Sequence, residues 1–147
     1  MSNFLDNLSG YLLDTNIISE LVKPKPNEKV MRRLQQKDSS MLFISVLTLG
    51  EIRKGINGIT DPQKYGTISH FLEVQLPDYF EERILPIDQK IADMWGQVQS
   101  KLKGHHLSAI DALIAATAIV HNLKLVTRNV KDFVHIPVEI INPWEDE

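Results

Sequence analysis

Short apolar segments that alternate with stretches of helical periodicity restrict the fold of this chain more than any other feature. Segments of strand length occur at residues 11–13, 41–45, 83–87, 124–127 and 138–141. Between them, apolar residues recur every three or four positions, as on one face of a helix. Because parallel strands need crossover connections, strands alternating with helices favour a parallel sheet. The pattern therefore predicts an α/β fold with a mostly parallel sheet.

Capping residues and prolines mark the ends of the predicted helices. Asp14, Asn27 and Asp88 each precede a stretch of helical periodicity, as N-caps do. Pro24 and Pro26 end the first helix. Further helices are expected at 47–56, at 62–80 with an interruption near Pro77, and at 108–121, which is apolar almost all round and should be buried.

Length and composition indicate one globular domain. A chain of 147 residues with 43% hydrophobic and 24% charged residues is typical of a single folded unit. Residues 1–10 show no clear period, so we expect an N-terminal extension followed by one domain at 11–147. The absence of cysteine excludes disulfides, thiolate-bound metals and thiol nucleophiles.

The charge and the apolar runs narrow the possible environments. A net charge of −3 does not favour nucleic-acid binding, unless the acids surround a metal ion that reverses the local sign. No secretion signal is visible, and the longest apolar run, 112–120, is far shorter than the ~18 residues that span a bilayer. We therefore expect a cytoplasmic protein with no membrane partner.

Three carboxylates are candidates for a shared site. Asp14 follows the first predicted strand, at the sheet edge where open parallel sheets bind ligands. Asp111 begins the most apolar helix, and Glu51 lies on the edge of another. Each also has a structural interpretation: Asp14 as a helix N-cap, Asp111 in a capping box with Ser108, and Glu51 paired with Lys54.

The turn after residues 124–127 adds two polar candidates, Asn129 and Asp132, although both are common turn residues. Carboxylates that cluster repel one another unless they are protonated or bridged by a cation. A ligand set made only of oxygen suits Mg²⁺ or Mn²⁺ better than zinc. Such a site suits phosphodiester chemistry, in which the metal activates water.

Four motifs occur in a fixed order: Tyr11-Leu-Leu-Asp-Thr-Asn16, Leu49-Gly-Glu-Ile-Arg53, Ala109-Ile-Asp-Ala-Leu-Ile-Ala-Ala116 and Leu125-Val-Thr-Arg-Asn129. The ordered set resembles the PIN-domain family and, within it, the VapC- and FitB-like toxins of type II toxin–antitoxin pairs. The terminal Asn142-Pro-Trp144 resembles the FitB branch. The resemblance extends from Tyr11 to Trp144.

The resemblance implies a three-layer α/β/α domain that acts as a metal-dependent endoribonuclease. The family's three acids fall on Asp14, Glu51 and Asp111, which would be the Mg²⁺ or Mn²⁺ ligands, and its fourth polar position falls on Asn129. Metal-activated water would then hydrolyse an RNA phosphodiester bond. Because an amide is a weaker ligand than a carboxylate, Asp132 is a candidate for supplying the missing charge.

Other polar residues near these motifs receive supporting roles. Thr15, Asn16, Ser45 and Thr127 are candidates for orienting the carboxylates by hydrogen bonds. Arg53 and Arg128, with Lys54 and Lys131, are candidates for guiding RNA. Six basic residues between 23 and 37 form either a phosphate track or a solvated helix face. His105 and His106 are expected to be exposed loop residues.

By resemblance, the partners are RNA, a cognate antitoxin protein and a second copy of the chain. The apolar residues of the helices after Asp14 and Asn27 are expected to receive the antitoxin. An alternative is a catalytically weak or inactive PIN-like module that binds RNA or protein, which the amide at Asn129 favours. An aspartyl-phosphate phosphatase or receiver domain is disfavoured, because Leu13 and Asn16 stand where that class places acids.

Overall fold

A computed structural model describes residues 9–145 and shows a five-stranded, fully parallel sheet with strand order β3-β2-β1-β4-β5. The strands are β1 (Tyr11–Leu13), β2 (Leu42–Ser45), β3 (Ile84–Leu85), β4 (Lys124–Val126) and β5 (Ile140–Ile141). Leu12 of the central strand pairs with Phe43 on one side and Leu125 on the other. The parallel sheet predicted from the alternation is confirmed.

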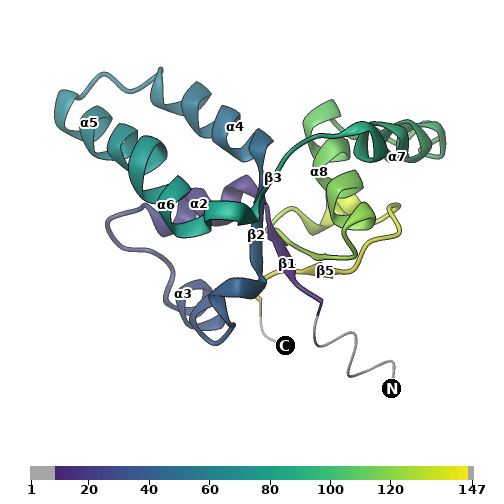
Figure 1. Cartoon of the computed structure of the whole chain (residues 1–147), viewed down its shortest axis with the longest axis horizontal. Coiled ribbons are helices and arrows are strands. Elements are labelled where there is room, and N and C mark those ends of the chain that lie inside the picture. The colour runs from purple at the N-terminus through teal and green to yellow at the C-terminus, as the bar shows by residue number, and fades with distance from the viewer. Residues whose placement is uncertain (1–8, 146–147) are drawn as a thin grey trace.

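Helices cover both faces of the sheet (Figure 1). One face carries α7 (Gln89–Ser100) and α8 (Ala109–Val120); the other carries α2 (Thr15–Leu21), α3 (Glu28–Gln35), α4 (Val46–Ile56), α5 (Pro62–His70) and α6 (Leu76–Phe80). Short 3-10 turns occupy η1 (Ser39–Met41), η3 (Glu81–Arg83) and η4 (Val130–Phe133). This arrangement is the three-layer α/β/α fold that the family resemblance implied.

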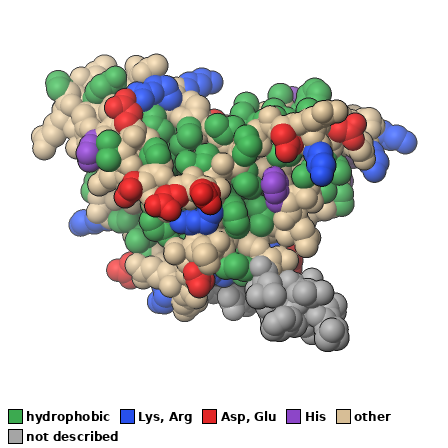
Figure 2. Space-filling model, in the orientation of Figure 1, with side chains coloured by type: hydrophobic (Ala, Val, Ile, Leu, Met, Phe, Trp, Pro, Cys, Tyr) green, Lys and Arg blue, Asp and Glu red, His purple; other side chains and the backbone are tan. Residues whose placement is uncertain are grey.

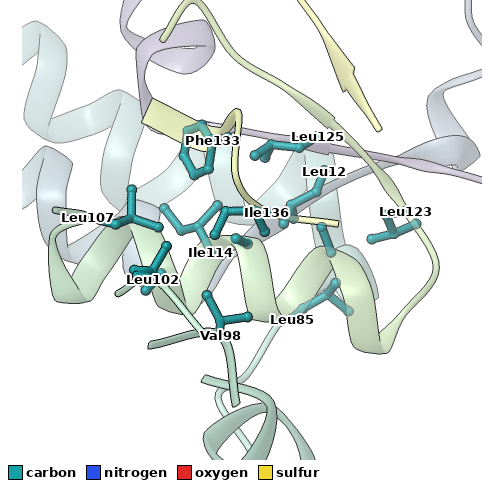
Figure 3. Packing of buried hydrophobic residues seen from close by; sticks show 13 residues of the cluster. Leu12, Leu85, Val98, Leu102, Leu107, Ile114, Leu123, Leu125, Phe133 and Ile136 are labelled. Carbon is teal, nitrogen blue, oxygen red and sulfur yellow. The ribbon is translucent and has the colours of Figure 1, made fainter. Parts of the chain in front are cut away.

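Each face of the sheet has its own hydrophobic core. Beneath α8, the buried cluster includes Leu12, Ile114, Leu125 and Phe133, which are at most 1% exposed (Figure 3). On the opposite face, Leu13 and Val126 belong to a cluster with residues of α2, α3, α6 and the turn η2 (Phe71–Gln75). Adjacent strand residues such as Leu12 and Leu13 therefore serve opposite cores, as strand geometry requires.

The predicted caps are present. The Asn27 side chain accepts a hydrogen bond from the Val30 N–H at the start of α3, and Asp88 accepts one from the Ile91 N–H at the start of α7. At the start of α8, the Ser108 hydroxyl accepts from the Asp111 N–H. These bonds satisfy N–H groups that have no partner inside the helix.

The helix expected over 62–80 differs in its middle. Residues Phe71–Gln75 (η2) form a π-helical turn, in which the Leu76 N–H bonds to the Phe71 carbonyl. Pro77 lies in the first turn of α6 and has no N–H to continue the preceding ladder. The interruption therefore comes just before the proline rather than at it, and the chain stays helical on both sides.

Two further predictions need comment. The strand expected at 83–87 is only two residues long, because Arg83 belongs to a 3-10 turn and Pro86 has no N–H for the ladder. Most of the N-terminal extension expected at 1–10 lies outside the described residues. Within 9–145, no helix has the length and apolar character needed to cross a membrane.

Candidate active site

Sheet topology brings distant polar residues together at one edge. Asp14 directly follows β1, and Thr127 directly follows its neighbour β4. The Asp14 N–H donates to the Val126 carbonyl at 2.9 Å, which extends the ladder beyond β1. The carboxyl ends of both strands thus lie side by side, where α/β folds place ligand sites.

The Asp14 carboxylate is buried and held by three donors. Its Oδ1 accepts from the Thr15 N–H at 2.8 Å, and its Oδ2 accepts from the Thr127 hydroxyl at 2.8 Å and the Asn16 side-chain amide at 3.3 Å. An ionised carboxyl oxygen has two acceptor sites, so Oδ2 is fully used while Oδ1 keeps one. Asp14 therefore caps α2 and still has acceptor capacity.

Glu51 reaches the same site from α4. The Thr15 hydroxyl donates to Glu51 Oε1 at 2.5 Å and lies 3.0 Å from the Thr48 hydroxyl. Thr15 thus links two carboxylates, with its backbone bonded to Asp14 and its side chain bonded to Glu51. The hydrogen bond of Glu51 goes to Thr15 rather than to Lys54, the partner of the structural alternative.

Asp111 comes from the opposite helical layer, in the first turn of α8, where it is partly buried. Asn129 follows β4 and is exposed, and its N–H donates to the Thr127 hydroxyl at 3.1 Å. Asp14, Glu51, Asp111 and Asn129 all border one open cleft of about 380 Å³. The complete lining is Asp14, Thr15, Asn16, Ser19, Glu20, Lys23, Glu51, Asp111, Arg128, Asn129 and Trp144.

Six residues proposed from the sequence do not line this cleft, Lys54 and Lys131 among them. Thr127 lies fully buried behind Asp14. Ser45 is the N-cap of α4 and accepts from the Leu47 N–H at 3.0 Å. The Arg53 guanidinium pairs with Glu73 of η2 at 2.8 Å. Asp132 lies in η4, near enough for its charge to act on Asp111.

The site raises the pKa of two of its acids. Burial raises the pKa of Asp14 to about 6, and the nearby charges of Asp111 and Glu51 add to this effect against the lowering hydrogen bonds from Thr127 and Thr15. Burial also raises the pKa of Asp111, with the charge of Asp132 in the same direction. Like charges brought together out of water resist ionisation, and a bound cation relieves that repulsion.

The donor set suits a hard cation that keeps part of its water shell. Among residues 9–145, no three His, Asp or Glu side chains are close enough to form a ready metal cage. Mg²⁺ does not require such a cage, because it retains several waters and binds through one or two carboxylates plus substrate phosphates. The free acceptor position on Asp14 and the oxygens of Asp111 and Glu51 fit this mode.

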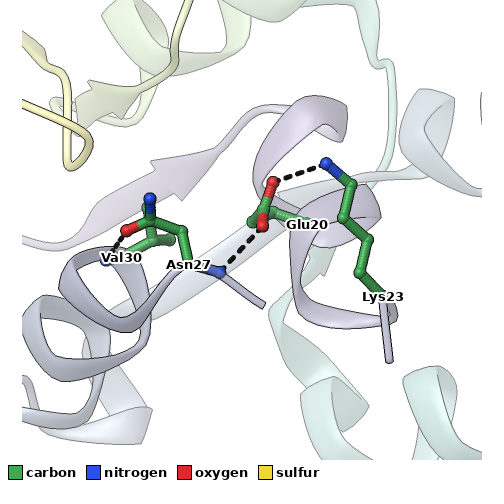
Figure 4. A network of polar contacts seen from close by, with 4 residues as sticks. All are labelled: Glu20, Lys23, Asn27 and Val30. Carbon is green, nitrogen blue, oxygen red and sulfur yellow. Dashed lines mark hydrogen bonds and ion pairs between the residues drawn. The ribbon is translucent and has the colours of Figure 1, made fainter. Parts of the chain in front are cut away.

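Sequence reasoning missed Glu20, which is 6% exposed and borders the cleft. Its carboxylate accepts from Lys23 Nζ at 2.9 Å and from the Asn27 N–H at 2.8 Å (Figure 4). These two bonds, the Lys23 bond first, lower the pKa of Glu20, so this acid is ionised. The available signal was its position within the apolar stripe of α2, three residues after Ile17.

The matching family model is that of the PIN domain, which covers residues 11–139. The chain therefore belongs to the PIN domain family, and the resemblance found in its motifs is confirmed. Toxin FitB of Neisseria gonorrhoeae is 36% identical over 137 residues, covering 92% of this chain and 99% of that protein. VapC ribonuclease Y4jK of Sinorhizobium fredii is 31% identical, covering 91% and 97% respectively.

Solved structures of similar proteins share the fold. FitAcB from Neisseria gonorrhoeae contains a chain with a TM-score of 0.87 and 36% identity, covering 92% of this chain and 99% of that one. FitAB bound to an IR36 DNA fragment gives a TM-score of 0.86 at 34% identity, with coverage of 93% and 97%. VapBC-1 from nontypeable Haemophilus influenzae gives 0.73 at 28%, with coverage of 92% and 98%.

Proposed function

We propose that this chain is the toxin of a type II toxin–antitoxin pair and acts as a metal-dependent endoribonuclease. The observation that carries the proposal is the convergence of Asp14, Glu51 and Asp111, from three separate elements, on one cleft at the carboxyl edge of the sheet. The relatives named as ribonucleases and the toxin–antitoxin structures support the same function.

Each polar residue of the cleft would have its own role. Asp14, Asp111 and Glu51 would hold Mg²⁺, with Mn²⁺ as an alternative, directly or through water. When bound, such an ion activates water and stabilises the charge that develops on a phosphodiester. Asn129 would hold a water or a phosphate oxygen by its side-chain amide, which cannot act as a base.

Hydrogen bonds would keep these carboxylates oriented. Thr127 and Asn16 both donate to Asp14 Oδ2 and so fix the orientation of the carboxylate. The free acceptor position on Oδ1 is then held in one direction. Thr15 holds Glu51 near Asp14 through one short hydrogen bond from its hydroxyl to the Glu51 carboxylate. Partners of this kind limit ligand motion, so we propose them as orienting residues.

An apolar groove supports the antitoxin as a partner. The groove has a volume of about 800 Å³ and runs between α2, α3, η2 and α6. Its apolar lining includes Leu21, Met31, Leu34, Phe71 and Tyr79. The sequence predicted antitoxin binding on α2 and α3. Ile17 and Val30 of those helices are buried in the core, whereas Ile18, Leu21 and Leu34 border the groove. We propose that an apolar helix of the antitoxin docks in the remaining groove.

Self-association is also proposed. On the face shown in Figure 2, hydrophobic side chains gather between the α4–α5 helices and the α7–α8 helices. Val46, at the start of α4, is 40% exposed although it is large and apolar. Apolar surface of this kind favours a protein contact, and light scattering of the purified chain would measure the oligomeric state.

The test is cleavage of a labelled mixed RNA pool with Mg²⁺ or with EDTA. We expect wild-type cleavage only with the metal, and loss of at least ~100-fold in Asp14→Asn and Asp111→Asn. Asp93→Asn is the matched control, because Asp93 is exposed on α7 and bonds to Gln97. Cleavage that survives both site substitutions would refute the assignment of the active site.

A binding module that does not cut RNA is the second candidate. The amide at Asn129, a weaker metal ligand than a carboxylate, favours it. The same assay separates the two candidates. If folded, metal-loaded wild type retains RNA but leaves every RNA intact, the binding module is the better description.

A further inference from the structure

One wall of the cleft is formed by an arginine stacked on a tryptophan. The Arg128 guanidinium carbon lies 4.9 Å from the centroid of the Trp144 ring, and both residues border the cleft. A guanidinium over an indole is the strongest of the common cation–π pairs. Arg128 lies within residues 11–139, which the PIN domain model matches, and Trp144 lies just beyond them.

The turn that carries Trp144 is tied to the domain. Its N–H donates to the Asn142 side chain at 3.0 Å, which fixes the local turn. Arg33 of α3 donates to the carbonyls of Asn142 and Glu145, both at 2.8 Å. Two bonds from a helix more than a hundred residues earlier therefore hold the indole beside the cleft.

The backbone of Arg128 is held by a hydrogen bond, whereas its guanidinium donors are free among the described residues. Its backbone N–H donates to Asn16 Oδ1 at 3.3 Å, next to the Asp14 site. In the part of the chain that the structure describes, its guanidinium makes no ion pair or hydrogen bond, and it is exposed. Each carboxylate oxygen of Glu20, the nearby acid, already accepts a hydrogen bond, one from Lys23 and one from Asn27. The five N–H donors of Arg128 remain available.

The charge of the cleft explains why such a cation is useful. Four acids (Asp14, Glu20, Glu51 and Asp111) face two cations (Lys23 and Arg128) in the lining. An RNA strand carries a negative charge at every phosphate, so the acids alone would repel the strand on either side of the reacting bond. A planar guanidinium can offset this repulsion by binding a phosphate through two parallel hydrogen bonds.

We propose that Arg128 binds a backbone phosphate of the RNA adjacent to the one that is cleaved, and that Trp144 is the positioning residue that holds the guanidinium for it. The proposal rests on the proposed ribonuclease function. Lys23, which also borders the cleft and pairs with Glu20, supplies a second cation as a point charge. Arg33 acts indirectly, because its hydrogen bonds hold the turn that carries Trp144.

The first experiment measures cleavage kinetics of a single RNA oligonucleotide with Mg²⁺. We expect Arg128→Gln and Trp144→Ala each to raise KM roughly tenfold while kcat stays within about twofold. Trp144→Phe should restore most of the wild-type KM, because a phenyl ring still offers a cation–π face. The salt dependence of binding should fall by about one phosphate contact in Arg128→Gln, a slope change of roughly 0.7. Lys101→Gln, at an exposed site beyond α7, is the control for lost charge.

A second experiment reports on Trp144 without any cleavage. The chain has two tryptophans, and Trp95 is partly buried with an indole nitrogen that has no hydrogen-bond partner among the described residues. Trp95→Phe therefore removes no described hydrogen bond and leaves Trp144 as the one tryptophan fluorophore. In a Trp95→Phe, Asp14→Asn background, we expect added RNA oligonucleotide to change the Trp144 fluorescence, and Arg128→Gln to weaken that response roughly tenfold.

The outcomes separate this proposal from the proposed function. If wild type cuts RNA but Trp144→Ala keeps the wild-type KM and the fluorescence does not respond, the Arg128–Trp144 subsite is refuted and the nuclease stands. If the fluorescence responds to RNA and Arg128→Gln weakens that response, but wild type cuts no RNA, the nuclease is refuted and the phosphate contact of Arg128 stands on its own. A Trp144→Ala variant that loses kcat and thermal stability together, without a KM change, would assign Trp144 a purely structural role and overturn the proposal.

Discussion

The two faces of the sheet are built differently. On the face of α7 and α8, the core closes over apolar residues, and six residues of α8 are buried along its length. On the face of α2 to α6, a second core forms, but the helices leave grooves of about 800 and 300 Å³ beside it. The first face supplies packing and has a pocket of about 380 Å³ at the C-terminal end of α8, whereas the second supplies packing together with open apolar surface.

The candidate site lies where these two layers meet. Asp111 comes from α8 of the closed face, Glu51 comes from α4 of the open face, and Asp14 comes from the central strand between them. A rigid support on one side holds Asp111 in place. The open side offers room for the macromolecular partners of the proposed toxin. The difference between the faces can be tested by making the same substitution on each.

The largest effect is expected for Phe133→Ala compared with Phe80→Ala. Phe133 is 0% exposed beneath α8, whereas Phe80 is 3% exposed but borders the open groove. Loss of a buried phenyl ring costs about 3–5 kcal/mol of unfolding free energy, and less where the site can relax. Urea denaturation should place Phe133→Ala in the upper part of this range and Phe80→Ala about 1–2 kcal/mol below it. Equal losses would remove the distinction between the faces.

The next largest effect is a pH dependence of stability at the candidate site, where the two helical layers meet. The pKa of Asp14 is raised from 3.8 to about 6, so the folded protein binds this proton more tightly than the unfolded chain does. In metal-free protein, Asp14 should therefore cost stability as pH rises from about 4 to above 6, by roughly 3 kcal/mol in total.

Asp14→Asn keeps a capping oxygen and cannot ionise, which makes it the matched variant for this measurement. Denaturation of both proteins in EDTA should show Asp14→Asn gaining on wild type through that pH window. Titrating groups that lie away from the site cancel in the comparison, whereas Asp111 and Glu51, whose charges act on Asp14, contribute to the difference. A difference between the two proteins that stays constant from pH 4 to pH 7 would contradict the raised pKa.

A smaller effect is expected at the junction of α2 and α3 on the open face. Glu20→Gln loses the ionised acceptor for Lys23 and Asn27, so Tm should fall by roughly 2–6 °C. Because the pKa of Glu20 is lowered in the folded protein, its stabilising effect is present above the usual glutamate pKa and disappears as pH falls. The Tm difference should therefore narrow in acid. Glu82→Gln, at an exposed site, serves as control.

The smallest change in stability is expected at Met31, which is partly exposed in the groove. Met31→Ala should alter the unfolding free energy by about 1 kcal/mol or less, yet weaken antitoxin binding roughly tenfold. Met94→Ala offers a matched change on the closed face, where Met94 packs against the α8 core. Calorimetric titration with antitoxin should give a weaker affinity for Met31→Ala than for Met94→Ala. Equal affinities would exclude the groove as the docking site.

Local signals predicted most of the fold. The apolar segment at Tyr11–Leu13 became β1, and Asn27, Asp88 and Ser108 cap the helices that they were expected to cap. The π-helical turn before Pro77 was not predicted, because it depends on how η2 packs against α5 and α6. Periodicity alone cannot distinguish such a turn from ordinary helix.

The candidate site was only partly readable from the sequence. Asp14 and Asn129 follow strands directly, so the parallel sheet determines where they lie. Ser45 also ends a strand, but its hydroxyl serves as the cap of α4, a competing use that its position alone did not reveal. The Asn27 N–H holds Glu20, and Arg33 holds the turn that carries Trp144, so both placements depend on how α3 packs against other parts of the chain.

The order of strands in the sheet has a consequence during protein synthesis. A nascent chain that ends before Leu123 already contains Asp14, Glu51 and Asp111, but it lacks β4, which pairs with β1. It also lacks Thr127, whose hydroxyl binds Asp14. Long-range parallel pairing is completed late, once the distant segment exists. We therefore expect the proposed active site to be completed only when the last part of the chain has been made, and chains truncated at Asn122 should show no ribonuclease activity.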